Sequence, residues 1–144
     1  MPPPFVVGGA FFIYHFGMNR WRYYNPNPSG EANIDCAVRA VSAALDTDWR
    51  GAYALIHAQG YGDGGMGPVN DTWGAVLRRH GFRRAVIPNS CPDCYTAEDF
   101  AIDNPVGTYV LGFFGHTAAV IDGFIYDSFD SSRMIPQYYW YREE

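Results

Sequence analysis

One cysteine, one histidine and one aspartate stand in this chain in an order that suits nucleophilic chemistry. Cys36 follows Asp35 at the predicted start of a helix, where the partial positive charge of the helix terminus favours a thiolate. His116 and Asp127 follow later in the chain, on two segments with the pattern of paired strands. A histidine that is oriented by a carboxylate is the usual partner of a reactive thiol. The three residues together predict a thiol that attacks a carbonyl carbon.

The turn Asp122-Gly123 allows a test of this geometry, because an Asp-Gly pair between two apolar runs is typical of a two-residue hairpin. Side chains alternate between the two faces of a strand. With the turn at this place, His116 and Asp127 fall on the same face as diagonal neighbours. Asp130 falls on the opposite face. The register therefore selects Asp127 as the partner of the histidine.

The chemistry assigns a role to each residue. Cys36 is the nucleophile, His116 is the general base and then the general acid, and Asp127 orients the ring. The backbone N–H of Cys36 is a natural donor to an oxyanion, and Asn33 is a candidate for a second donor. The structural alternative is that Cys36 and His116 are ordinary packed residues, which is the commoner fate of either type alone. Their shared arrangement with Asp127 favours the catalytic interpretation.

The remaining elements must position these groups. Apolar residues at spacings of three and four, together with capping residues, predict four helices. These span 36–45, Thr47 or Asp48 to about Gly60, 71–80 and 96–102. Alternating apolar residues predict strands over 82–87, 108–113, 116–121, 124–128 and 137–141. Helices followed by consecutive strands indicate an α+β fold, with N-terminal helices packed on a C-terminal antiparallel sheet.

Composition restricts the classes of protein. The chain has 144 residues, of which 48% are hydrophobic, so we expect one packed domain. The formal net charge is -5 and no run of basic residues exists, which argues against a nucleic-acid partner. Three cysteines do not indicate a disulfide framework, so a reducing cytoplasm is the simpler compartment.

The first residues differ from the rest of the chain. The apolar run from Phe5 to Phe16 contains His15 and is shorter than the roughly twenty residues that span a bilayer. It also lacks the basic start of a signal peptide. We expect no membrane partner, a start at Met18 with 1–17 as an extension, and a single domain over 18–144. An additional strand or a membrane-surface anchor is the alternative for 1–17.

Several stretches of the chain resemble papain-like cysteine peptidases, and more closely the small uncharacterised phage, prophage and gut-bacterial members of that superfamily. They are YYNPNP at 23–28, DCAVRA at 35–40, CPDCYT at 91–96, GHTAAVIDGFIYD at 115–127 and IPQYYW at 135–140. The resemblance implies a papain-like fold and a hydrolase that cleaves a peptide or isopeptide bond through a catalytic triad of Cys36, His116 and Asp127. It also implies a peptide or protein substrate, no required cofactor, and the cytoplasm of a bacterial host or phage-infected cell.

The chain departs from the family pattern at one position. Papain-like peptidases carry a glutamine about six residues before the nucleophile, where it donates to the oxyanion. Gly30 occupies that position here, and no glutamine precedes Cys36. Two alternatives therefore stay open beside hydrolysis. One is a cysteine-dependent transamidase or acyltransferase, and the other is a non-enzymatic phage or host-interaction protein on a degenerate peptidase scaffold.

Cys91 and Cys94 form a second cysteine motif with two residues between them. This spacing fits plain free thiols in a loop, half of a zinc site or a redox pair. A structural zinc needs four ligands, and only His57 and His80 are available to complete the set. The metal interpretation therefore places zinc at Cys91 and Cys94, with the other two alternatives left open.

Overall fold

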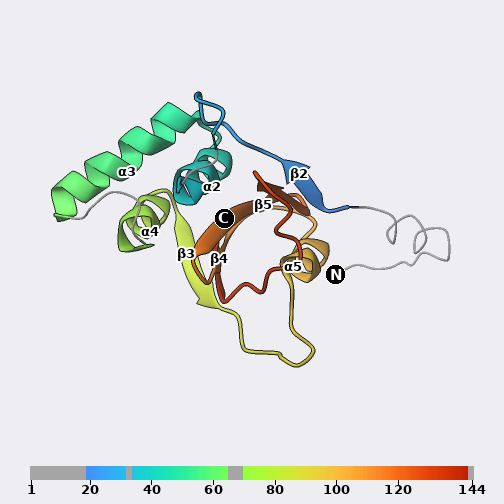
Figure 1. Ribbon diagram of the computed structural model, residues 1–144. Coiled ribbons are helices and arrows are strands. Elements are labelled where there is room, and N and C mark those ends of the chain that lie inside the picture. The colour runs from blue at the N-terminus through green and yellow to red at the C-terminus, as the bar shows by residue number, and fades with distance from the viewer. Residues whose placement is uncertain (1–18, 32–33, 65–69, 143–144) are drawn as a thin grey trace.

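The computed structural model describes residues 19–31, 34–64 and 70–142 (Figure 1). The expectations for 1–17 and Met18 lie outside the described residues. The helices are α2 (Cys36–Leu45), α3 (Trp49–Asp63), α4 (Asn70–Arg79) and α5 (Ala97–Asp103). The strands are β2 (Trp21–Tyr23), β3 (Phe82–Val86), β4 (Thr108–Phe113), β5 (His116–Ile121), β6 (Phe124–Asp127) and β7 (Tyr138–Arg142). The α+β class is confirmed, and every predicted helix and strand is present within a few residues.

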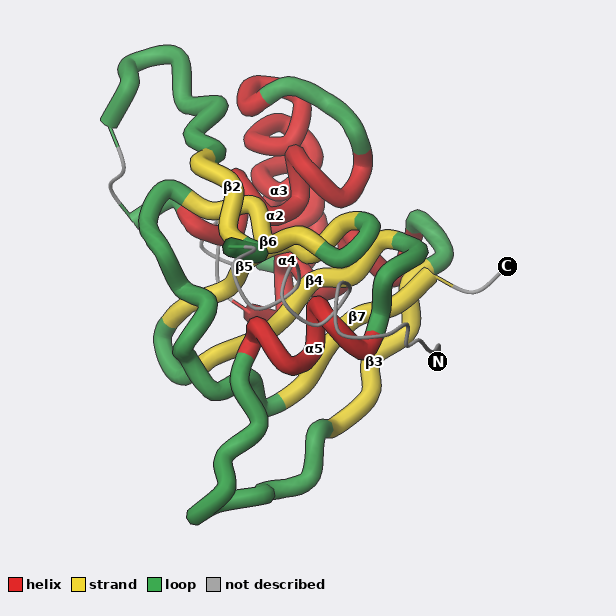
Figure 2. The backbone as a smooth tube through the Cα atoms, turned by 90° about the vertical axis from the view of Figure 1, so that its right-hand side faces the viewer, coloured by secondary structure: helices red, strands yellow, loops and turns green. Residues whose placement is uncertain are grey.

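The strands form one six-stranded sheet in the order β2-β6-β5-β4-β7-β3 (Figure 2). Neighbouring strands from β6 to β3 pair antiparallel, whereas β2 pairs parallel with β6. The sheet is therefore mixed, and the prediction of an antiparallel sheet is wrong at this edge. The lead-in Trp21–Tyr23 was not predicted as a strand because three residues are too few to show a period.

Helices cover both faces of the sheet, as β4 shows most directly. Val110 packs in a core cluster with residues of α2, α3 and α4. The next residue, Leu111, packs in a second cluster with residues of α5. Successive side chains of a strand point to opposite faces, so α2, α3 and α4 lie on one side and α5 on the other (Figure 1). No helix among the described ranges combines the length and apolar character that crossing a membrane requires.

Local sequence signals fix several of these boundaries. The carboxylate of Asp48 accepts a hydrogen bond of 2.7 Å from the backbone N–H of Gly51 and caps α3. Thr96 and Asp99 form the predicted capping box at the start of α5. Asp122 and Gly123 have φ of 49° and 81°, the left-handed conformation that a tight hairpin turn requires. The β5–β6 hairpin is thereby placed in the predicted register.

Asp35 departs from its expected role at the start of α2. It occupies the N-cap position, but its side chain makes no capping hydrogen bond. The carboxylate instead pairs with Arg39 one turn along the helix, where the spacing of four residues brings the two side chains together. It also accepts hydrogen bonds from Asn27 at 3.1 Å and from the indole of Trp49 at 3.0 Å. Asp35 therefore ties the lead-in segment and α3 to the helix that carries Cys36.

Gly112 gives a test of the packing between β4 and β7. A Cβ atom at this position would lie 2.2 Å from the ring of Tyr138, so the ring or the strand must move. We expect Gly112→Ala to lower the free energy of unfolding by about 1–3 kcal/mol, measured by urea denaturation. Gly62→Ala is the control, because that glycine lies in α3 with nothing within 4 Å of its added Cβ. Equal effects of the two substitutions would contradict the prediction.

Candidate active site

A cleft of about 560 Å³ lies where the start of α2 meets the β4–β5 turn and the segment after β6. Cys36 and His116 both line this cleft. Its apolar walls include Trp73 from α4, Phe113 from β4 and Phe129 from the segment after β6. The structure thus brings the predicted nucleophile and the predicted base, distant in sequence, to one concave site with aromatic walls.

Cys36 is the first residue of α2 and is partly buried. Burial alone raises the pKa of its thiol. Hydrogen bonds from His116 and from the backbone N–H of Thr117, together with the positive charges of His116 and Arg39, outweigh burial and lower the pKa below its ordinary value of 9.0. The thiolate is therefore stabilised by a specific set of donors and cations, which is the condition for a reactive cysteine.

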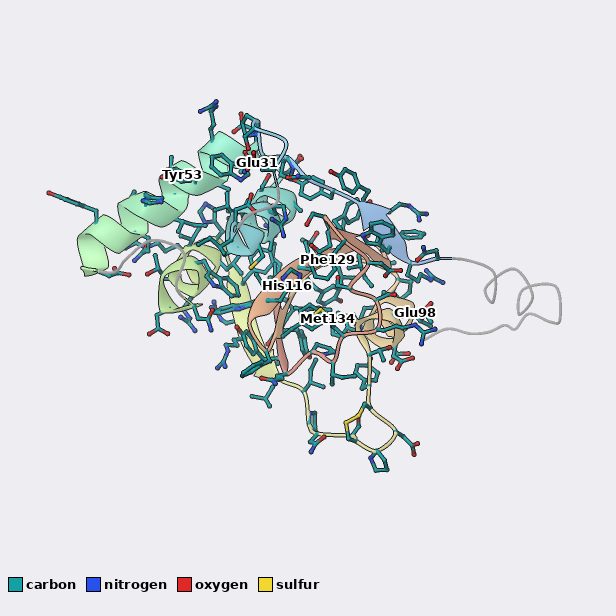
Figure 3. The ribbon with its side chains drawn as sticks, viewed as in Figure 1. Glu31, Tyr53, Glu98, His116, Phe129 and Met134 are labelled. Carbon is teal, nitrogen blue, oxygen red and sulfur yellow. A yellow bond between two sulfur atoms is a disulfide. The ribbon has the colours of Figure 1, made fainter. Side chains whose placement is uncertain are left out.

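His116 is the first residue of β5, at the open end of the hairpin. Its Nε2 atom is 2.7 Å from Oδ2 of Asp127, which leaves Nδ1 to face the thiol. Burial lowers the pKa of the imidazole, but the hydrogen bonds and negative charges of Asp127 and Cys36 raise it to about 9. The ring contacts Phe113 and Phe129, with centroids 5.7 and 4.8 Å away, and Figure 3 shows Phe129 near His116.

Asp127 is the last residue of β6, and its side chain is only 1% exposed. Its Oδ2 atom bonds His116 and also accepts a 2.7 Å hydrogen bond from the hydroxyl of Ser131. Its Oδ1 atom accepts from the backbone N–H of Ser128 at 2.8 Å. The carboxylate is thus held on both oxygens, and the predicted pairing of His116 with Asp127 is confirmed.

Arg39 joins this carboxylate to the N-terminal end of α2. Its side chain is 5% exposed, its Nη1 pairs with Asp35, and its Nη2 is 3.5 Å from Oδ1 of Asp127. The pair with Asp35 follows from helical spacing alone, whereas the contact with Asp127 depends on how α2 packs on the sheet. A buried row of alternating charges therefore runs from Asp35 through Arg39 and Asp127 to His116.

Two groups among the described residues are candidate donors to an oxyanion. Cys36 begins α2, so its backbone N–H has no partner within the helix, as the sequence predicted. Asn33, the predicted second donor, lies outside the described residues. Asn70 at the start of α4 lines the cleft and was missed in the sequence. Its Oδ1 accepts from Trp73 at 3.2 Å, and its amide nitrogen has no hydrogen-bond partner among the described residues.

Sequence reasoning also missed Ser131 and the two phenylalanines on either side of His116. The three serines among the five residues after Asp127 were the available signal for Ser131, because such side chains often bond a nearby carboxylate in a turn. Phe113 and Phe129 carried no distinct signal, since aromatic residues are frequent throughout this chain.

Cys91 and Cys94 form a disulfide at the tip of the loop between β3 and α5 (Figure 3). The predicted zinc site at these cysteines is wrong, because both sulfurs are bonded to each other. The described residues contain no group of three metal-binding side chains. His57 stacks on Tyr53 and His80 bonds the carbonyl of Val76, so neither approaches the pair as a ligand. The alternative of plain free thiols is wrong for the same reason.

Comparisons of the chain with family models, with curated proteins and with solved structures find no match.

Proposed function

We propose that the protein is a cysteine-dependent hydrolase of peptide or isopeptide bonds, with Cys36, His116 and Asp127 as its catalytic residues. One observation carries the proposal: Cys36 and His116 line the same cleft, His116 lowers the pKa of the thiol, and Nε2 of His116 is 2.7 Å from the buried carboxylate of Asp127. A purely structural histidine has no need for a thiolate partner that opens onto a cleft. The papain-like resemblance of the sequence agrees with this function.

The first half of the reaction follows from the geometry. The thiolate of Cys36 attacks the carbonyl carbon of the substrate, and the C=O electrons move to oxygen. The backbone N–H of Cys36 donates to this oxyanion, with the amide of Asn70 as the second donor. When the tetrahedral intermediate collapses, the C–N bond breaks and His116 gives its proton to the leaving amine. The product is an acyl thioester on Cys36.

The second half uses the same residues in reverse. His116, now neutral, takes a proton from a water molecule whose oxygen attacks the thioester carbon. The carboxylic acid leaves, and the proton on His116 restores the ion pair with Cys36. An amine or alcohol in place of water would give a transamidase or acyltransferase with no change in the residues. We propose hydrolysis because the catalytic residues of the resembled family perform it.

The reactivity of Cys36 tests the proposal. The double variant Cys91→Ser/Cys94→Ser leaves Cys36 as the only thiol of the chain. At about pH 6 we expect iodoacetamide to modify it at least tenfold faster than N-acetylcysteine, because the lowered pKa increases the fraction of thiolate. Adding His116→Ala removes the donor and the positive charge, so this advantage should disappear. Intact-mass spectrometry at timed intervals measures both rates.

The pH dependence separates an ion pair from a merely accessible thiol. The pKa of His116 is raised to about 9, so the imidazolium supports the thiolate below that pH and is lost above it. We expect the ratio of the rates with and without His116 to be largest near pH 6 and to shrink as the pH rises through about 9. A ratio near one across the range would contradict the proposed enzyme and favour the binding protein.

A further inference from the structure

A second hollow, of about 400 Å³, adjoins the cleft that Cys36 lines and lies between α4 and the neighbouring strands β3 and β7. Asn70 lines both spaces and marks where they meet. Tyr138, on the wall of the second hollow, has a raised pKa because of burial, and the negative charge of Cys36 adds to that shift. The cleft and the hollow therefore share a lining residue, and the charge of Cys36 in the cleft acts on a side chain of the hollow.

Two arginines on the wall of this hollow present unused donors. The guanidinium of Arg78 lies 5.0 Å from the ring centroid of Trp140, and that of Arg84 lies 4.4 Å from the ring of Tyr138. Stacking uses the face of a guanidinium and leaves its N–H groups at the edge. Among the described residues neither arginine forms a hydrogen bond or an ion pair, although the whole chain carries a net charge of -5.

The remaining wall is also rich in donors. Trp140 is only 3% exposed, and its indole N–H has no hydrogen-bond partner among the described residues. The hydroxyl of Tyr138 and the amide nitrogen of Asn70, which has no partner among the described residues, add two more donors. Asp71 is the one carboxylate on the described wall, and it pairs with neither arginine. The wall therefore keeps an excess of positive charge and of donors.

We propose that this hollow binds a carboxylate of the substrate, carried a few residues from the bond that Cys36 attacks. Planar guanidinium groups match the two oxygens of a carboxylate. The inference rests on the proposed function, because it treats the adjoining cleft as the place of reaction. The carboxylate belongs either to an acidic side chain or to the C-terminus of a peptide, and both present the same chemistry to Arg78 and Arg84.

Matched reactive peptides test this inference. Epoxysuccinyl peptide diamides extend to either side of the reactive carbon, so one series compares glutamate with glutamine at each position. A second series compares a free C-terminus with its amide. We expect the carboxylate of one matched pair to speed modification of Cys36 about tenfold. The series in which this occurs tells which source of carboxylate the hollow accepts.

Substitutions in the wall of the hollow test whether the carboxylate preference arises there. Arg78→Gln and Arg84→Gln should each remove most of the carboxylate preference. Arg79→Gln is the matched control, because Arg79 follows Arg78 on α4 but does not line the hollow. Iodoacetamide should modify Cys36 at the same rate in all three variants. If no pair differs by more than twofold while iodoacetamide still reacts rapidly, the inference is wrong and the proposed function stands.

If Cys36 proves unreactive, a binding measurement tests the carboxylate site independently of any reaction. The indole N–H signal of Trp140, assigned by its loss in Trp140→Phe, should shift when N-acetylglutamate α-amide is added to the ¹⁵N-labelled protein. N-acetylglutamine α-amide should leave the signal in place. A shift with glutamate alone supports the anion site even if the proposed reaction fails. No shift with either compound would overturn it.

Discussion

Replacing Asp127 by asparagine is expected to lower turnover by about 10³–10⁴-fold, in the range that loss of the carboxylate causes in a catalytic triad. The shape of the side chain is kept, but one oxygen becomes an NH₂ group. If NH₂ takes the place of Oδ2, it meets the N–H of His116 and the ring must adopt the other tautomer. If it takes the place of Oδ1, it meets the N–H of Ser128 and the guanidinium of Arg39.

The rate of Cys36 alkylation at about pH 6 measures the loss of the ion pair, since a neutral imidazole cannot hold a thiolate as an ion pair. Hydrolysis of amide substrates that carry the same side chains as the fastest-reacting epoxysuccinyl peptides measures the loss of turnover. Ser131→Ala is the matched control, because it removes a hydrogen bond to the same Oδ2 atom but keeps the negative charge. We expect its effect to be about tenfold or less. Similar losses in the two variants would show that the charge of Asp127 is not what matters.

The parts of the site that sequence reasoning predicted depend on short-range rules. An Asp-Gly turn fixes the register of the β5–β6 hairpin, and that register alone places His116 beside Asp127. Helix α2 likewise begins at Cys36 as expected. These features involve neighbours within about a dozen residues, where turn chemistry and side-chain periodicity decide the structure.

The parts that were missed depend on contacts between distant segments. Strand β2 joins the sheet by pairing parallel with β6, which lies about a hundred residues later in the chain. No local sequence pattern predicts such a pairing. Arg39 reaches Asp127 only because α2 packs across the hairpin. The spacing of Cys91 and Cys94 allows a disulfide, a metal site or free thiols, and the conformation of the loop decides among them.

The buried charges explain why the thiol of Cys36 and the imidazole of His116 stay together. Asp127 carries one negative charge in the interior, and a buried carboxylate without a cation is costly. Arg39 supplies the cation from α2, the same helix that carries Cys36. His116 supplies a second positive charge from β5. The helix with the thiol and the hairpin with the imidazole are therefore joined through one carboxylate.

Replacing Arg39 by methionine is expected to cause the largest loss of stability of any single substitution considered. Methionine keeps most of the volume of the side chain but removes the charge. Asp35 and Asp127 are 7% and 1% exposed, so both carboxylates would lose a buried cationic partner. Breaking a buried ion pair from one side typically costs about 3–5 kcal/mol. Urea denaturation at neutral pH measures the change in the free energy of unfolding.

Arg50→Met is the matched control, because Arg50 is exposed on α3 and its loss should change the free energy of unfolding by less than about 0.5 kcal/mol. Arg39→Lys keeps the charge but loses the fork that reaches two carboxylates at once, so we expect it to recover part of the stability and not all of it. Full recovery would mean that charge alone suffices, without the bridging geometry. A loss in Arg39→Met no larger than that in Arg50→Met would mean that the buried charges do not hold α2 to the hairpin.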